Sequence, residues 1–226
     1  MLVREHMTPN PVTIRPGSDF LAAVAILKAA RFHSLPVVTA DGELVGIVTD
    51  KDVAAASPPA VDLLQPRKPD FYGVHLTVQQ VMNPDVVVIG PDVPLEDAAW
   101  TMLEERVDRL LIVEDGSLVG IITGTDIFRQ LVSILGGGSS AIRMTVEVVN
   151  APGQLAKLAG AIAAVGGNIV SVATARASKD LLTLTLRVEE ADWPTLERAL
   201  EEGCQARVLH VCGPDGLCLD RTGETR

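Results

Sequence analysis

The segment DGELVGIVTDKDV, residues Asp41–Val53, recurs with small changes as DGSLVGIITGTDI at Asp115–Ile127. In both copies an Asp-Gly turn leads into an apolar strand, and a helix opens at the Thr that closes the strand. The similarity continues upstream, where V-x-x-x-M-x-P and V-x-I-x-P occur in Val3–Val38 and again in Val78–Val113. Two copies of roughly 50 residues are too few for a solenoid, so they predict two halves related by a pseudo-twofold axis.

Each copy has the pattern of a short strand, a helix, two strands and a second helix. Ser18 or Asp19 can cap the first helix, whose apolar residues recur at helical spacing, and Pro94 lies in the first turn of its counterpart. Prolines mark the segment between the copies as a linker, with a short helical piece near Val61–Leu64. The expected boundaries are residues 1–135 for the pair, about 3–57 and 78–135 for the repeats, and 58–77 for the linker.

The pattern changes beyond Gly136–Ser140, a connector that is flexible by composition. An alternating strand from Arg143 precedes a helix, and two strands, a second helix and a last strand at Ala206–Val211 follow. This βαββαβ order over residues 141–213 is the ferredoxin-like arrangement, and residues 214–226 have the composition of a polar tail. The expected fold class is α+β. The first of these two helices is expected to turn one stripe inward, made of Leu155, Leu158, Ala159, Ile162 and Val165.

The composition limits what the chain can bind and where it works. Its formal net charge is -10, with no basic tail or stripe, which argues against binding to nucleic acid or to an anionic membrane surface. The first residues lack the apolar core of a signal peptide, and glycines interrupt the uncharged run Leu158–Ala175, so no membrane span is predicted. The cysteines Cys204, Cys212 and Cys218 lack C-x-x-C spacing. They fit a reducing cytoplasm and predict neither a disulfide framework nor a metal site.

The same polar pair opens the last helix of each copy: Thr49 with Asp52, and Thr123 with Asp126. One interpretation is structural, because Thr followed three residues later by an acid can form a capping box for free backbone N–H groups. The other is functional, because a carboxylate at a helix start can accept both hydroxyls of a ribose while the helix end favours a phosphate. The duplication at equivalent points gives the two interpretations similar weight.

Both copies resemble CBS domains, on MTPNPVTI, RFHSLPVV and DGELVGIVTDKDV in the first and on MNPDVVVI, RLLIV and DGSLVGIITGTDI in the second. The resemblance implies a module that binds an adenosine-type ligand, such as AMP, ADP, ATP or S-adenosylmethionine, in the clefts between repeats. It assigns phosphate and ribose to the Thr and Asp that open each last helix. It also implies that the base lies against the first short strand and the L-P-V segment, which comprise Thr13, Ile14, Leu35 and Pro36.

The residues available to meet a phosphate differ between the copies. CBS domains often carry Arg just before the L-P-V strand, where this chain has His33 in the first copy and Asp108 followed by Arg109 in the second. Lys51 has Thr125 as its counterpart. We therefore expect unequal sites, with phosphate binding better supported in the first repeat by Lys51 and His33, while the second offers mainly Arg109. For Lys51, a solvated surface charge is the alternative.

The third segment resembles an ACT domain on NAPGQLAKL, from Asn150, and on GGNI, which ends at Ile169. ACT domains pair side by side and often bind amino acids near these two elements. The family commonly has Asp at the position of Asn150. For Gly153 and Asn168 the favoured alternative is backbone geometry, a tight turn and a left-handed residue. The residues implied for an ACT ligand or interface are Asn150, Gly153, Gln154, Leu155 and Asn168.

The sequence offers no catalytic apparatus. His6, His33, His75 and His210 are scattered, and no P-loop, G-x-G-x-x-G, nucleophile-elbow or metal-spaced Cys/His motif occurs. We therefore predict a non-catalytic, cytoplasmic regulatory or sensor protein that forms a homodimer and acts on an unknown protein partner. Its domain order resembles that of acetoin utilization proteins of the AcuB type. The alternatives are an interaction module without a small-molecule ligand, or a regulatory subunit of an enzyme complex.

Overall fold

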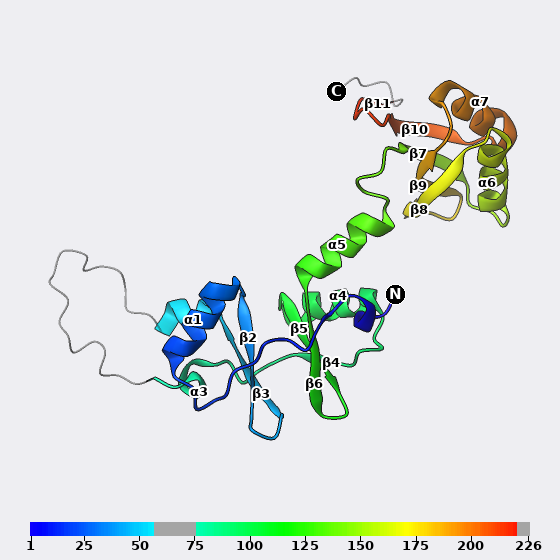
Figure 1. Ribbon diagram of the computed structural model, residues 1–226. Helices are drawn as coiled ribbons and strands as arrows, with labels where there is room; N and C mark the ends of the chain where they lie inside the picture. Colours follow the sequence, from blue (N-terminus) through cyan, green and yellow to red (C-terminus); the bar gives the residue numbers. More distant parts are fainter. Residues whose placement is uncertain (57–75, 221–226) are drawn as a thin grey trace. The chain divides into compact units, whose positions relative to one another are not determined.

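The chain is an α+β protein, as predicted, and it divides into unit 1, Met1–Phe128, and unit 2, Arg129–Arg226 (Figure 1). The computed structural model describes residues 1–56 and 76–220. The helical piece expected near residues 61–64, most of the linker and His75 therefore lie outside the described residues.

The first repeat follows the expected order of strands and helices. Asp19 caps its first long helix, because the Asp19 side chain accepts a hydrogen bond from the N–H of Leu21 at 2.8 Å. The strands after this helix pair as an antiparallel hairpin. The elements are η1 (Val3–Glu5), β1 (Thr8–Pro9), α1 (Phe20–Ala30), β2 (Ser34–Val38), β3 (Leu44–Thr49) and α2 (Asp50–Ala56).

The second repeat has the same order of elements, with Pro94 as the N-cap of its first long helix. Its strands join β1 of the first repeat in a four-stranded sheet of order β1-β6-β5-β4. The elements are α3 (Val78–Val81), β4 (Val88–Ile89), α4 (Leu95–Glu105), β5 (Arg109–Glu114), β6 (Ser117–Thr123) and α5 (Gly124–Ile134).

The leading segment of each repeat packs against the other repeat. Val3 of η1 is fully buried in the core of the second repeat, and its N–H donates to the carbonyl of Val93 at 3.0 Å. Reciprocally, Val78 of α3 is buried in the core of the first repeat, and its N–H donates to the carbonyl of Ser18 at 2.9 Å. The repeats in the sequence therefore do not coincide with the two hydrophobic cores, because each core includes the leading segment of the other repeat.

Two glycines in the repeated motif allow this exchange. A Cβ on Gly46 would lie 2.8 Å from the carbonyl oxygen of Asn83 and 2.9 Å from the sulfur of Met82. A Cβ on Gly120, the equivalent position, would collide with the sulfur of Met7. Because each M-x-P segment lies across the β-strand of the opposite repeat, a residue without a side chain is required at both crossings.

Unit 2 is an antiparallel sheet of order β11-β10-β7-β9-β8, whose buried face packs against two helices (Figure 1). Alternate residues of β7 and β9 are buried together with Leu158 and Ile162 of α6 and with Leu196 and Leu200 of α7. The elements are β7 (Ile142–Val149), α6 (Gln154–Ala164), β8 (Asn168–Ala177), β9 (Leu181–Glu189), α7 (Trp193–Cys204), β10 (Arg207–Cys212) and β11 (Cys218–Asp220).

Three expectations for unit 2 were wrong. Leu155 and Ala159 are exposed, because the buried face of α6 is centred on Leu158 and Ile162 instead. The strand β11 lies within the residues expected to be a polar tail, and it pairs with β10. Cys212 and Cys218 form a disulfide, because β11 brings them opposite each other, whereas no disulfide was expected.

No helix among the described residues has both the length and the apolar composition to cross a membrane.

Candidate functional site

Both Thr-x-x-Asp elements form reciprocal capping boxes. In the first, Oδ2 of Asp52 accepts from the N–H of Thr49 at 2.7 Å and from its hydroxyl at 2.6 Å, while the Asp52 N–H donates to Thr49 Oγ1 at 3.4 Å. Asp126 repeats this arrangement with Thr123 at 3.0, 2.7 and 3.3 Å. The structural interpretation of the motif is thus correct for both copies. A carboxylate has further acceptor positions, so the box does not exclude a ligand.

The first box lines a cleft of unit 1, and the second box does not line that cleft. This cleft has a volume of about 630 Å³ and draws on both repeats. The first repeat contributes Thr49, Lys51 and Asp52, and the second contributes the segment just before β4, the end of α4 and the start of β5. Its lining residues are Ile47, Thr49, Lys51, Asp52, Asn83, Asp85, Val86, Val87, Met102, Leu103, Arg106, Val107, Asp108, Arg109 and Leu111.

The cationic side chains that the sequence assigned to separate sites lie in one cleft. Lys51 and Arg109 both line it, together with Arg106. Arg109 also joins the repeats, because its Nη1 donates to the carbonyl of His33 at 3.1 Å. The His33 imidazole is exposed and meets Asp50 at 2.7 Å. The sequence assigned Lys51 and His33 to one site and Arg109 to the other, whereas Lys51 and Arg109 line the same cleft.

Asp108 forms an ion pair with Arg109 in the cleft. Its two carboxylate oxygens accept from Nε and Nη2 of Arg109 at 2.7 and 2.8 Å, in a bidentate arrangement. These hydrogen bonds, followed by the charges of Arg109 and Lys51, hold the pKa of Asp108 below its usual value against the opposing effect of partial burial. Asp108 is therefore ionised at neutral pH.

The other expected nucleotide-binding residues lie outside this cleft. Thr123 and Asp126 do not line it, and Thr13 is half-buried elsewhere in the first repeat. Ile14 and Leu35, expected beside the base, instead have side chains buried in the core of the first repeat, and Pro36 is buried in β2. For a ligand, the side chains of Ile14 and Leu35 are out of reach because they fill the core.

Apolar residues of the second repeat stand beside the first box, and the sequence reasoning missed them. Val86, Val87 and Leu111 line the cleft with Thr49. Leu111 is the counterpart of Pro36 at the offset that relates the two repeats. The alignment of the two repeats contains this signal. The sequence places the base contacts in the same repeat as the first Thr-x-x-Asp element, whereas the cleft combines this element with residues of the opposite repeat.

The expected ACT residues do not form one site within a chain. Asn150 fixes the β8–β9 turn, because its Nδ2 donates to the carbonyl of Ser178 at 2.6 Å. Asn168 opens β8 and pairs with Glu189, at the opposite end of that strand. Gly153 is the N-cap of α6 with φ of +85°, as its backbone interpretation requires, whereas Gly166 and not Asn168 is left-handed.

Two further residues of this group lie beside Gly153 at the start of α6. Leu155 is 53% exposed. Gln154 is half-buried, and its Oε1 is buried without a hydrogen-bond partner among the described residues.

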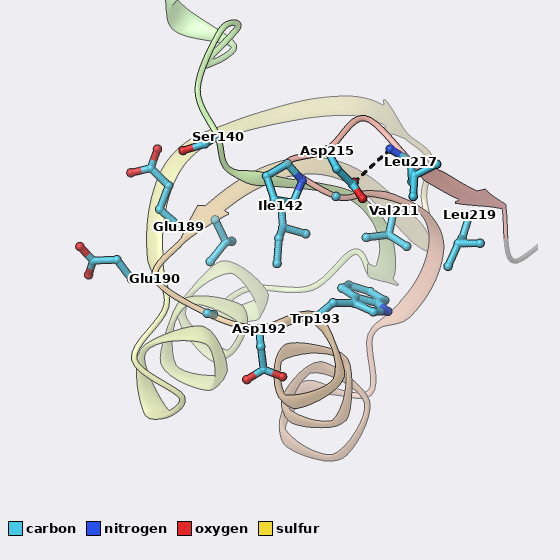
Figure 2. A pocket seen from close by; sticks show the side chains of 14 residues that line it. Ser140, Ile142, Glu189, Glu190, Asp192, Trp193, Val211, Asp215, Leu217 and Leu219 are labelled. Carbon is cyan, nitrogen blue, oxygen red and sulfur yellow. Dashed lines mark hydrogen bonds between the residues drawn. The ribbon is translucent and has the colours of Figure 1, made fainter.

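Unit 2 contains a separate hollow of about 690 Å³ between β10–β11 and the start of α7 (Figure 2). Ile142, Trp193 and Val211 point into it, whereas Glu189 and Glu190 point outward in Figure 2. It lies at the opposite end of β7 from Asn150, so it is distinct from the region that the ACT resemblance indicated.

Comparison with known proteins identifies the family of this chain. Residues 3–58 and 78–133 match the CBS domain, and residues 137–212 match the TTHA0829-like ACT domain. The CBS domain-containing protein YhcV of Bacillus subtilis is 30% identical over 148 residues, which make up 66% of this chain and 98% of YhcV. The chain belongs to the CBS-domain proteins and carries two CBS domains followed by an ACT domain.

Longer relatives match over only a part of their length. The uncharacterized protein MJ1225 of Methanocaldococcus jannaschii is 30% identical over 129 residues, 57% of this chain and 42% of MJ1225. Inosine-5'-monophosphate dehydrogenase of the same organism is 34% identical over 127 residues, 56% of this chain and 23% of the enzyme. The chain thus spans less than half of either protein, and most of that enzyme has no counterpart in the match.

Two solved structures resemble part of the chain. One is a protein from Vibrio cholerae assigned to acetoin utilization (AcuB), with a TM-score of 0.50, 26% identity, and coverage of 60% of this chain and 93% of that chain. The other is CBSX2 in complex with AMP, with a TM-score of 0.50, 29% identity, and coverage of 59% and 97%.

Proposed function

We propose that this chain is a regulatory protein that senses an adenosine-type nucleotide in the cleft between its two CBS domains. The observation that supports this most is the composition of the cleft. It combines the Thr49–Asp52 box of one repeat with Lys51 and, from the other repeat, with Arg109 and an apolar wall. Ribose, phosphate and base each have a matching group in that set.

Each part of such a ligand has a physical reason to bind there. The Asp52 carboxylate can accept the two ribose hydroxyls, a charge-assisted contact stronger than one between neutral groups. Lys51 and Arg109 can meet a phosphate, and Val87 and Leu111 offer apolar surface to an adenine ring. A volume of about 630 Å³ is within the range of small-molecule sites. The AMP bound to CBSX2, a protein of similar fold, agrees with this ligand class.

We further propose that binding regulates a partner and catalyses no reaction. A ligand that contacts both repeats favours the arrangement of the repeats in which it fits best, and this differential affinity is what a sensor requires. The cytoplasm, which holds adenine nucleotides, is the proposed location. Incubation of the protein with ATP tests for catalysis. We expect the ATP to be recovered unchanged, and turnover of ATP would contradict a purely regulatory role.

Ligand binding to the native state must raise the melting temperature. We expect at least one of AMP, ADP, ATP and S-adenosylmethionine to do so, and a ligand at 100 times its Kd adds about 2.7 kcal/mol to the free energy of unfolding. Differential scanning fluorimetry with each ligand measures this, with inosine monophosphate as the control for the adenine ring. No shift with any of the four at millimolar concentration would instead favour an interaction module without a small-molecule ligand.

The closed capping boxes are the observation that favours this second candidate. In both repeats the Thr hydroxyl and the Asp carboxylate already bond to each other. A pure interaction module would retain these boxes for helix capping alone and would need no open cleft beside the first of them.

A homodimer belongs to the same proposal. The residues Phe128, Leu131, Val132 and Leu135 follow the helical spacing i, i+3, i+4 and i+7 on and just after α5, and all four are at least 39% exposed. None of the α5 residues is buried. We propose that a second copy of the chain covers this apolar stripe. In a symmetric dimer the same stripe of both copies is buried in one contact.

An amino acid is the proposed ligand of the ACT domain. The buried Oε1 of Gln154, which lacks a partner among the described residues, is an acceptor that an ammonium or amide group could satisfy. Fluorimetry with the twenty amino acids tests this proposal, and the absence of any shift in melting temperature would contradict an amino-acid ligand.

A link to acetoin utilization rests on the likeness to the Vibrio cholerae protein alone. Co-purification with enzymes of acetoin metabolism would support that link, and their absence from pull-downs would speak against it.

A further inference from the structure

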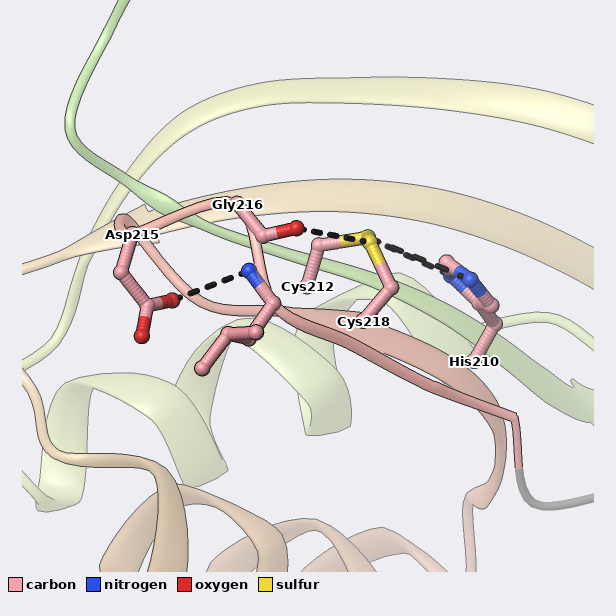
Figure 3. The surroundings of a disulfide bond; sticks show 6 residues. His210, Cys212, Asp215, Gly216 and Cys218 are labelled. Atoms are coloured by element: carbon pink, nitrogen blue, oxygen red, sulfur yellow. Dashed lines mark hydrogen bonds between the residues drawn. A yellow bond between two sulfur atoms is a disulfide. The ribbon is translucent and has the colours of Figure 1, made fainter. Parts of the chain in front are cut away.

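The β10–β11 hairpin of unit 2 gathers three side chains that commonly bind metals (Figure 3). Cys212 and Cys218 lie directly opposite each other in the antiparallel register, and His210 precedes Cys212 by two residues along β10. Residues two apart on a strand project from the same face of the sheet. One ligand atom from each of His210, Cys212 and Cys218 lies within 4.8 Å of the others.

We propose that these three side chains bind a thiophilic divalent metal ion such as Zn²⁺ once the disulfide is reduced. Zinc takes Cys sulfur at about 2.3 Å and His nitrogen at about 2.0–2.1 Å in a tetrahedron, so its S and N ligands stand roughly 3.5 Å apart. The Cys212 sulfur is 3.8 Å from Nδ1 and 3.9 Å from Nε2 of His210. The imidazole is therefore already close to the separation that a shared metal ion requires.

The hairpin has contacts that hold the two cysteines together without the sulfur–sulfur bond. The N–H of Gly213 donates to the carbonyl of Leu217 at 2.9 Å. Asp215 accepts from the N–H of Leu217 at 3.1 Å (Figure 2). Gly216, with φ of +82°, completes the turn in a conformation that glycine adopts without strain. Because the turn fixes the register, reduction leaves both thiols on the same side of the hairpin.

Access to the hairpin suits both a reductant and a metal ion. Cys218 is exposed, while His210 and Cys212 are half-buried. Three protein ligands leave one tetrahedral position for water. The remaining cysteine, Cys204, is different: it is buried in α7, its thiol donates to the carbonyl of Leu200 at 3.1 Å, and burial raises the pKa of that thiol. Cys204 is therefore not a ligand and serves as a control.

The chemistry balances in two steps. A dithiol gives two electrons and two protons to the sulfur–sulfur bond, which breaks into two thiols, while the dithiol becomes a cyclic disulfide. Zn²⁺ then binds two thiolates and the neutral imidazole, and two protons leave to solvent. In a reducing cytoplasm the thiol form is the one that persists, so the metal-binding state would be the resident state there.

The test compares oxidised and reduced protein. The full chain is reduced with a dithiol, desalted without oxygen, and titrated with Zn²⁺ by calorimetry, while the oxidised chain is titrated in parallel. We expect one Zn²⁺ per reduced chain, release of protons on binding, and no binding to the oxidised chain. Cd²⁺ added to the reduced chain should give the ultraviolet charge-transfer absorption of a cadmium–thiolate bond.

Single-residue variants test whether the Zn²⁺ ion binds at the β10–β11 hairpin. His210→Ala retains both cysteines and should weaken Zn²⁺ binding by at least ~10-fold, and Cys218→Ser should weaken it at least as much. Cys204→Ala should bind like the wild type. Equal binding to the oxidised chain, no binding to the reduced wild type, or wild-type affinity in His210→Ala would each overturn the proposal. Far-ultraviolet circular dichroism of every variant verifies that unit 2 remains folded.

Discussion

Asp108 occupies two hydrogen-bond donors of Arg109 in the cleft. Three cationic side chains line the cleft, Lys51, Arg106 and Arg109, and three carboxylates line it too, those of Asp52, Asp85 and Asp108. Asp108 takes both parallel donors of Arg109, which are the donors that a phosphate would use. Because the pKa of Asp108 is lowered, its pairing with Arg109 is complete at neutral pH and is lost only as the pH falls through that lowered pKa.

Removal of this carboxylate should therefore favour anionic ligands. We expect Asp108→Asn to tighten AMP binding by roughly 3- to 10-fold, since one charged hydrogen-bonding competitor is worth about 1 kcal/mol or more. Calorimetric titration with AMP and with adenosine separates the effect, because adenosine lacks the phosphate and its affinity should stay unchanged. Asp41→Asn, which removes the same charge from an exposed turn, is the matched control. Weaker AMP binding in Asp108→Asn would show that Asp108 supports the ligand instead.

At the scale of elements, the exchange of leading segments makes unit 1 one cooperative body. The N–H of Ile47 donates to the carbonyl of Asn83 at 2.9 Å, and the N–H of Asn83 donates back to Ile47 at 2.8 Å. Gly46 lies beside this crossing with no room for a side chain. The same strand, β3, ends at Thr49, so the crossing also positions the first capping box.

A methyl group at Gly46 should weaken this crossing. We expect Gly46→Ala to lower the free energy of unfolding by about 1–3 kcal/mol, because the new Cβ meets the backbone oxygen of Asn83. Gly120→Ala should cost less, since it meets the flexible side chain of Met7. Gly90→Ala, with nothing within 4 Å of its Cβ, is the control. Urea denaturation measures all three, and equal stability of Gly46→Ala and Gly90→Ala would contradict the close crossing.

The local sequence pattern was enough to predict the order of the helices and strands, but not which elements pack against one another. Asp19 is the N-cap of α1 and Pro94 is the N-cap of α4, at the helix starts that the sequence predicted. The exchange of η1 and α3 was not predicted, because an apolar residue such as Val3 fits either of two similar cores. The same ambiguity affected the cleft: Thr49 and Asp52 were recognised, yet their apolar neighbours come from the opposite repeat. The strand β11 was missed because three residues carry too little periodicity.

At the scale of the whole molecule, the uncovered stripe on α5 predicts self-association. We expect the wild-type chain to be a dimer by size-exclusion chromatography with light scattering, and Phe128→Glu to be a monomer, because a charge in an apolar contact is costly to desolvate. Leu217→Glu alters an equally exposed apolar residue on the β10–β11 turn and should remain dimeric. A monomeric wild type, or a dimeric Phe128→Glu, would remove α5 as the interface.

We expect the first Thr-x-x-Asp element, and not the second, to bind the nucleotide. Calorimetric titration of AMP into Asp52→Asn and Asp126→Asn tests it most directly, because both variants disturb equivalent capping boxes while only Asp52 lines the cleft. We expect Asp52→Asn to lose at least ~10-fold in affinity, consistent with one charged hydrogen-bonding group, and Asp126→Asn to stay within about 2-fold of wild type. Equal losses in the two variants, or an unchanged Kd in Asp52→Asn, would show that the nucleotide does not bind at the first element in preference to the second.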